Sequence, residues 1–328
     1  MFVPSARACP PSTANLDSFI MSPLRSTSLL FALLGAGCSA PVVDDVADAS
    51  SALTDGVVLV ERVVASDGTT QTNISAKFMR LSVASDVEMA ERVVGSRLDL
   101  PRLGACMRLP AGGAGEKAAS LASLGPIELV DVGDVTMRVK APAPISGPAP
   151  VVPLALRAFP DVGDIVSGVF YTSPDAASDL PAGEAYVVDA SGSSVIDRFS
   201  IEADAPSAPE DVRVGGVPLS EGITLEDGVS APVRWRSGDS ARGDLVFIDV
   251  SGPSGAAVRC AFKDAGEAMV PGALLRSSPL GGNGATATFA LHRVRRRGFA
   301  PGLAGLDAGE VRFDLSVVGR ATLVSHTP

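Results

Sequence analysis

From residue 57 onward, short runs of β-branched and apolar residues alternate with turns rich in Gly, Asp and Pro. Runs of this length and composition predict β-strands. In the first part of the chain we expect strands at 57–64, 73–83, 105–109, 127–130, 135–139, 154–159, 165–171, 185–189 and 195–201. Short strands at this spacing are typical of a β-sandwich or barrel.

A second series of strands follows the Pro-rich stretch at 205–209. We expect its members at 212–214, 232–236, 245–250, 258–262, 268–270, 285–294 and 311–318. Pro-rich segments between two series of elements mark candidate domain boundaries. The pattern therefore predicts an all-β chain with two tandem β-sandwich domains, at 56–205 and 207–325.

Three segments depart from the strand pattern. In residues 86–97, Val87, Met89, Ala90, Val93 and Val94 are expected to line one helical face, which predicts a short helix. The Ala-Pro-rich run at 141–150 predicts an extended surface loop. Residues 271–275 predict one helical turn with a proline near its start.

The N-terminal region carries a different pattern. Arg25 precedes an apolar run at 28–34, which is too short to span a bilayer and indicates a signal sequence. Small residues then lead into Cys38. This stretch resembles the lipobox of bacterial lipoproteins, although Gly35 stands where that motif has an aliphatic residue. The resemblance implies a signal peptide at 1–37, with translation expected to start at Met21.

The same resemblance implies that the thiol of Cys38 receives lipid, such as palmitate, and anchors the chain. Ser39 follows the lipid site, and by likeness to Gram-negative lipoproteins this implies the outer membrane. Residues 38–55 are small and acidic and predict a flexible tether. The alternative is an ordinary secretory signal with a chance cysteine.

The second half resembles the immunoglobulin-like sandwich of lipoproteins of unknown function from GC-rich bacteria. The residues that carry this likeness are Val233-Arg234-Trp235-Arg236, Gly243-Asp244-Leu245-Val246-Phe247-Ile248, Val258-Arg259-Cys260 and Met269-Val270-Pro271-Gly272-Ala273-Leu274-Leu275. The likeness implies an immunoglobulin-like fold and no activity. The cysteine pair found within true immunoglobulin domains is missing.

The charge balance narrows the choice of partners. The net charge of −10 becomes −11 when the predicted signal peptide, which holds Arg7, Arg25 and Asp17, is removed. An acidic chain is unsuited to nucleic acid, whose phosphates require a basic face. We expect as partners the membrane, through the lipid anchor, and a protein or glycan of the envelope.

Two cysteines remain after the lipid site. Cys106 and Cys260 lie in different predicted domains, so a disulfide between them would tie the domains together. The alternative is two buried thiols, which pack like small apolar residues.

The turns that contain Asp131, Asp134, Asp161 and Asp164 share the sequence Asp-Val-Gly-Asp. Carboxylates on adjacent loops are the ligands that Ca²⁺ prefers, which makes these four residues a candidate calcium site. The alternative is that Asp and Gly only form turns here. We expect no other cofactor.

The chain offers little for catalysis. His292 and His326 are its two histidines, no Gly-x-Ser-x-Gly motif occurs, and we expect His292 to face outward from a strand. The basic island at 293–297 either contacts acidic glycans or phosphates, or protects a strand edge by charge. Alternation places Arg293 and Arg295 on one strand face and Arg296 on the other.

Taken together, these patterns predict a non-enzymatic lipoprotein of the cell envelope, acting as a structural or interaction module. The alternative function is calcium-dependent binding of carbohydrate or adhesion.

Overall fold

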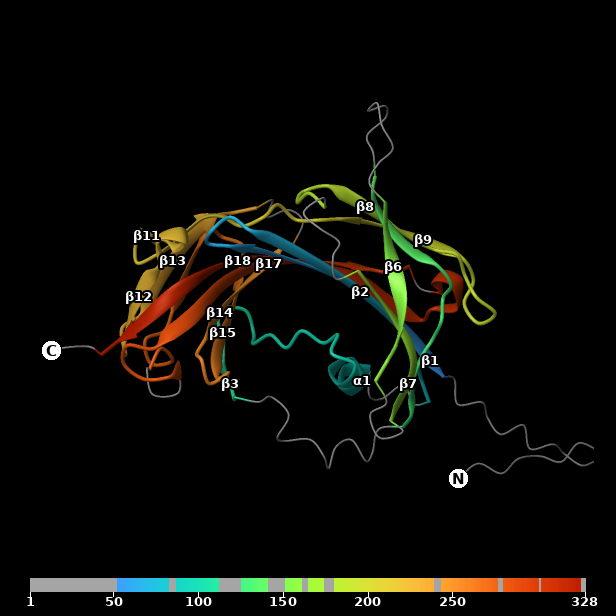
Figure 1. Cartoon of the computed structure of the whole chain (residues 1–328), viewed down its shortest axis with the longest axis horizontal. Coiled ribbons are helices and arrows are strands. Elements are labelled where there is room, and N and C mark those ends of the chain that lie inside the picture. The colour runs from blue at the N-terminus through green and yellow to red at the C-terminus, as the bar shows by residue number, and fades with distance from the viewer. Residues whose placement is uncertain are drawn as a thin grey trace, which may run out of the picture. The chain divides into compact units, whose positions relative to one another are not determined.

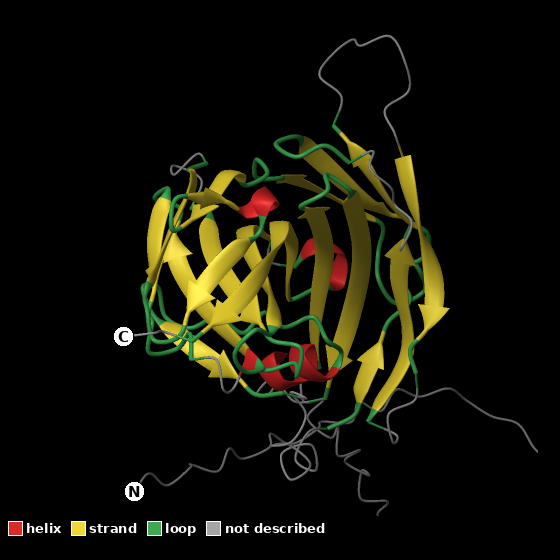
Figure 2. Cartoon of the chain, turned by 60° about the vertical axis from the view of Figure 1, so that its left-hand side comes forward, coloured by secondary structure: helices red, strands yellow, loops and turns green. Residues whose placement is uncertain are grey.

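A computed structural model describes residues 52–82, 87–111, 125–140, 151–160, 165–173, 180–238, 243–276, 280–300 and 302–325. The chain divides into two units, residues 1–46 and 47–328. The first unit lies outside the described residues, and with it the predicted signal peptide and Cys38. The second is built mainly from strands, and among the described residues 57% are in strands and 6% in helices (Figure 2). The predicted all-β, sandwich-type fold is confirmed.

The strands are, in chain order, β1 (Leu53–Ala65), β2 (Thr70–Leu81), β3 (Cys106–Leu109), β4 (Ile127–Leu129), β5 (Val135–Val139), β6 (Val151–Ala158), β7 (Val166–Ser173), β8 (Ala185–Ala190), β9 (Phe199–Asp204), β10 (Glu210–Val214), β11 (Val217–Pro218), β12 (Ile223–Glu226), β13 (Ala231–Arg236), β14 (Leu245–Ser251), β15 (Ala257–Lys263), β16 (Glu267–Val270), β17 (Thr286–Gly298) and β18 (Ala308–Val324). The helices are α1 (Val87–Val93) and the short 3₁₀ turns η2 (Leu219–Glu221) and η4 (Leu303–Gly305).

Most strands belong to one large sheet of 14 strands, in the order β3-β15-β14-β17-β18-β1-β2-β4-β7-β6-β5-β8-β9, with β12 beside β18 (Figure 1). A second sheet has the order β11-β10-β13-β16. Strands of the two predicted domains meet twice in the large sheet: β1 pairs in parallel with β18, and β3 pairs with β15. The large sheet therefore does not end at the boundary predicted near residue 206.

Two hydrophobic cores lie within this unit, and they follow the predicted boundary more closely than the sheet does. The first core takes its residues from 58 to 205, together with Leu306, Val311 and Phe313 from the stretch before and at the start of β18. The second takes its residues from 212 to 323 and includes Trp235 and Phe289. The first core therefore also takes residues from beyond the boundary, and β18 contributes to both cores.

A buried ion pair stands where the chain passes from the first core to the second. The side chains of Arg293 and Asp264 are 2.8 Å apart and each is 1% exposed. Trp235 Nε1 donates a hydrogen bond to Asp264 Oδ1 at 2.6 Å. Arg293 Nη1 also donates to the carbonyls of Ser207 and Ala208, at 3.1 and 3.0 Å. Because buried charges require partners, this network fixes the connecting segment to β17.

A third, smaller cluster confirms the predicted helix. Ala90 of α1 and Val94 just after it are buried against Met79 and Leu81 of β2 and against Ile127. Val87 and Val93 pack against the same cluster, so four of the five residues expected on one helical face lie together, and Met89 is not among them. In the part of the chain that the structure describes, no helix is long and apolar enough to cross a membrane.

Several strands differ from the predictions in their ends, and some were not predicted at all. β1 begins at Leu53, so the last residues of the predicted tether are in a strand, where Thr54 and Asp55 are buried. β9 begins at Phe199 rather than at residue 195. β12 was not predicted, because four residues with two buried side chains are too short to show a period. The predicted loop at 141–150 lies outside the described residues.

Candidate functional site

One face of the large sheet carries a row of charged side chains that hold a crossing segment of chain. We call residues 94–105, which connect α1 to β3, the strap (Figure 1). Lys77 Nζ of β2 donates to the carbonyl of Val94 at 2.7 Å. Arg259 Nη1 of β15 donates to the carbonyl of Asp99 at 3.0 Å. The strap is thus fastened to strands at both sides of the central part of the sheet.

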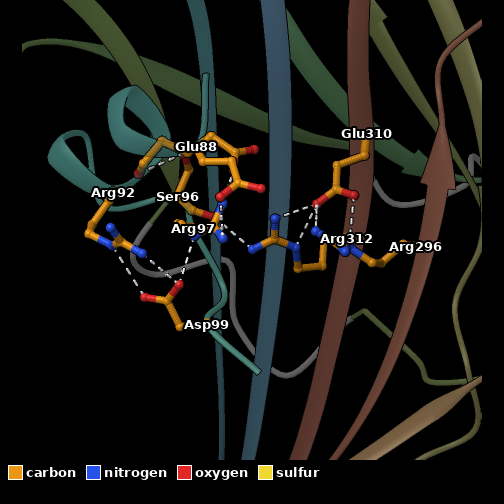
Figure 3. Close-up of polar contacts among 9 residues, drawn as sticks. Glu88, Arg92, Ser96, Arg97, Asp99, Arg296, Glu310 and Arg312 are labelled. Carbon is orange, nitrogen blue, oxygen red and sulfur yellow. Dashed lines mark hydrogen bonds and ion pairs between the residues drawn. The ribbon is translucent and has the colours of Figure 1, made fainter. Parts of the chain in front are cut away.

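Arg312 of β18 also binds the strap. Its side chain is 2% exposed, and its Nη1 donates to the carbonyl of Ser96 at 2.6 Å. Its Nε donates to Glu310 at 2.7 Å, and Arg296 of β17 pairs with the same carboxylate at 2.8 Å (Figure 3). Two arginines therefore share one carboxylate, and one of them also binds the strap.

The strap is further tied to α1 by ion pairs. Arg97 lies 2.9 Å from Glu88 and 2.7 Å from Asp99, and Arg92 lies 3.0 Å from Asp99 (Figure 3). The hydrogen bond from Arg92 is the main cause that lowers the pKa of Asp99. Burial raises the pKa of Glu91. These contacts give the strap a fixed conformation on the sheet.

His292 lies on the same face of the sheet. Its ring stacks on Phe247 with centroids 4.0 Å apart, and its Nδ1 is 2.8 Å from Asp314 Oδ1. The side chain is 18% exposed, so the expectation that it faces outward is wrong. Neighbouring strands supply the aromatic ring and the carboxylate, which the local sequence of β17 does not show. His326 lies outside the described residues.

Glu61 of β1 is the next charged group along this row. Burial raises its pKa, and the negative charge of Asp314 raises it further. Asp314 stands directly opposite Glu61 in the parallel pair of β1 and β18. The two carboxylates are therefore neighbours on adjacent strands.

The two cysteines left open by the sequence are joined. Cys106 and Cys260 stand opposite each other in β3 and β15 and form a disulfide. This bond closes the strap's far end onto the edge of the large sheet.

The two aspartates of the first Asp-Val-Gly-Asp turn have structural contacts. Asp131 Oδ1 accepts hydrogen bonds from the Tyr171 hydroxyl at 2.6 Å and from the Gly133 amide at 2.8 Å, and the first of these is the main cause that lowers the pKa of Asp131. The amide of Asp134 donates to Ser191 Oγ at 2.8 Å. Gly133 has φ +79°, and a Cβ there would lie 2.2 Å from the carbonyl oxygen of Gly192, so this turn requires glycine.

The calcium site predicted from these turns gains no support. Asp161 and Asp164 lie outside the described residues. Within the described ranges, no group of three or more His, Cys, Asp or Glu side chains is arranged to hold a metal ion.

The basic island is divided between the two faces of β17, as alternation predicted. Arg295 donates to both oxygens of Asp244, at 2.6 and 2.7 Å, and to the carbonyl of Ala205 at 3.0 Å. Arg296 points to Glu310 on the strap side. β14 pairs with β17 only as far as Val294, so the end of β17 that carries the arginines at 295–297 pairs with β18 alone, and the interpretation of the island as charge protection of a strand end stays a prediction.

A cavity of about 390 Å³ opens where β17 ends beside β8 and β9. We call it the β17 pocket. Its lining residues are Lys140, Ala185, Glu202, Ala203, Asp204, Arg295, Arg296 and Arg297. The sequence revealed the three arginines but not the opposite wall, since nothing local relates residue 140 or 202 to residue 297.

The comparisons with known proteins add no functional information. No family model and no curated protein matches the chain. One solved structure, described as "Crystal Structure of Rst D1-D2", aligns with 67% of this chain and 92% of its own at 11% identity. Its TM-score of 0.15 is too low to carry an argument.

Proposed function

We propose that this chain is an exported, lipid-anchored and non-catalytic module of the cell envelope, which acts through binding. The disulfide between Cys106 and Cys260 is the observation that supports export most directly. Disulfides form and persist in oxidising compartments and are rare in the cytosol. The lipobox-like stretch that ends at Cys38 supports the same compartment.

The arrangement of the strap supports a binding rather than a catalytic role. Arg312, Lys77 and Arg259 each donate a hydrogen bond to a backbone carbonyl of the strap, so they hold chain segments together. His292, stacked and hydrogen-bonded, has a defined structural environment. These contacts hold the strap in one position on the sheet. A fixed surface of this kind suits a protein that binds a partner.

The lipid anchor and the outer-membrane location are tested together in a Gram-negative host. The full chain is expressed with labelled palmitate, and its membranes are separated into inner and outer fractions. We expect label on the wild-type chain in the outer membrane. Cys38→Ala should lose the label and remain in the soluble periplasmic fraction.

Cys106→Ala with Cys260→Ala is the control, because it removes the two other cysteines that follow the predicted cleavage site and keeps Cys38. It should carry the label like the wild-type chain. Label that survives in Cys38→Ala, or an unlabelled wild-type chain in the cytosol, would overturn the proposal.

A further inference from the structure

The β17 pocket combines a fixed cation with two adaptable ones. Asp244, whose side chain is 0% exposed, binds the guanidinium of Arg295 through two hydrogen bonds, and the Ala205 carbonyl binds it through a third. A guanidinium has five N–H donors, so two remain for a ligand. The Arg295 side chain is therefore held in position and still has N–H donors for a ligand.

Arg297 and Lys140 supply the adaptable cations. Arg297 is exposed at the end of β17. Lys140 pairs with Glu202, and both side chains are at least half exposed, at 50% and 62%. Exposed ion pairs contribute little to stability, so this pair can open toward a ligand at small cost.

The opposite wall of the same cavity carries carboxylates. Glu202 and Asp204 lie on β9, across the pocket from the arginines. Carboxylates accept hydrogen bonds from hydroxyl groups and repel a ligand that presents only anionic oxygens. A ligand that suits both walls has one anionic group and several hydroxyl groups.

From this chemistry we infer that the β17 pocket binds an acidic sugar. The phosphate or carboxylate of the sugar lies on Arg295 and Arg297, whose planar guanidinium groups match such anions. The sugar hydroxyls donate to Glu202 and Asp204. The cavity volume of about 390 Å³ falls within the range of small-molecule sites. The inference rests on the proposed envelope location, where such sugars would be met outside the cell.

The test is calorimetric titration of the purified full chain with four probes: galacturonic acid, glucose 1-phosphate, uncharged galactose and inorganic phosphate. We expect the two charged sugars to bind at least tenfold more tightly than galactose or inorganic phosphate. Arg297→Ala should weaken binding of both charged sugars at least tenfold.

Arg234→Ala is the matched control, because Arg234 is an exposed arginine on β13, which is not part of the pocket. It should leave the affinities unchanged. Equal binding of inorganic phosphate and the charged sugars, no binding of either charged sugar, or an equal loss in Arg234→Ala would overturn the inference.

Two further arms separate the sources of the sugar and the two proposals. Stronger binding to vesicles that contain a phosphorylated glycolipid than to the free sugars would assign a membrane ligand, and the reverse would assign a soluble one. Cys38→Ala should retain sugar binding in solution, so a failed lipid anchor and a failed pocket give different results.

Discussion

Arg312 donates a hydrogen bond to the carbonyl of Ser96 at 2.6 Å, and the two residues are 216 positions apart in the chain. The same guanidinium binds Glu310 and is 2% exposed. A strand near the C-terminus thereby fixes the strap that follows α1. Substitution of Arg312 would take a charged donor away from both the Ser96 carbonyl and Glu310. The contribution of this contact to stability can therefore be measured directly.

We predict that Arg312→Met lowers the free energy of unfolding by about 3 kcal/mol, because the substitution leaves the Ser96 carbonyl and part of Glu310 without a donor. Urea titration measures this loss. Arg80→Met is the control, since Arg80 and its partner Glu128 are 35% and 56% exposed, and it should cost less than about 0.5 kcal/mol. Equal effects of the two substitutions would contradict the central role of Arg312.

The disulfide should contribute strongly to stability, because it closes a loop across a sequence separation of 154 residues. The chain-entropy estimate for such a loop is up to about 5 kcal/mol. Cys106→Ala with Cys260→Ala should lose most of this amount in urea titration. Reductant should destabilise the wild-type chain and leave the double variant unchanged; a wild-type chain insensitive to reductant would be at odds with the bond.

Glu61 should make stability depend on pH. Its pKa in the folded chain is raised above the ordinary value of 4.5, so its favourable contribution is complete below that pH and is lost as pH rises through the raised pKa. Asp314 adds to the shift, whereas His292, Lys77 and Asn73 oppose it. Replacing the Glu61 carboxylate with an uncharged amide removes this loss of stability at higher pH.

We therefore expect Glu61→Gln to stabilise the chain relative to wild type, by an amount that grows as pH rises above 4.5. Asn73 Oδ1 is a buried acceptor without a partner among the described residues, and a glutamine amide supplies a donor beside it. Urea titrations at pH values from 4 to 8 measure the difference. A difference that stays constant over this range would count against a shifted Glu61.

The shared sheet predicts that the two cores unfold together. Trp235, the one tryptophan, reports on the second core, and far-ultraviolet circular dichroism reports on all strands. Since β18 contributes to both cores, through Val311 and Phe313 to the first and through Ala321 and Leu323 to the second, the two signals should give a single coincident transition. Two separated transitions would show that the segments on either side of residue 206 are independent.

The sequence pattern predicted most strands and α1, because each depends on the period of neighbouring side chains. The pairing of β1 with β18 could not be predicted, since it joins residues such as Val60 and Phe313 that no local signal relates. The Pro-rich composition near residue 206 marks a boundary in the sequence. It does not show which strands before the boundary pair with strands after it.

The charged residues of the site show the same limit. Alternation placed Arg295 and Arg296 on opposite faces of β17, and the structure agrees. Their partners Asp244 and Glu310 come from other strands, so the sequence alone could not distinguish a structural arginine from one that lines a pocket. Lys77 and Arg259 are isolated charges within two separate strands. Nothing in the sequence indicates that both bind backbone carbonyls of the strap.

The intact mass of the protein, extracted from its native membrane, distinguishes an acylated chain from one that carries no lipid. We predict a chain that begins at an acylated Cys38 and lacks two hydrogens because Cys106 and Cys260 are joined. A mass without acyl groups, or one that retains the residues before Cys38, would contradict the account of an exported, lipid-anchored module.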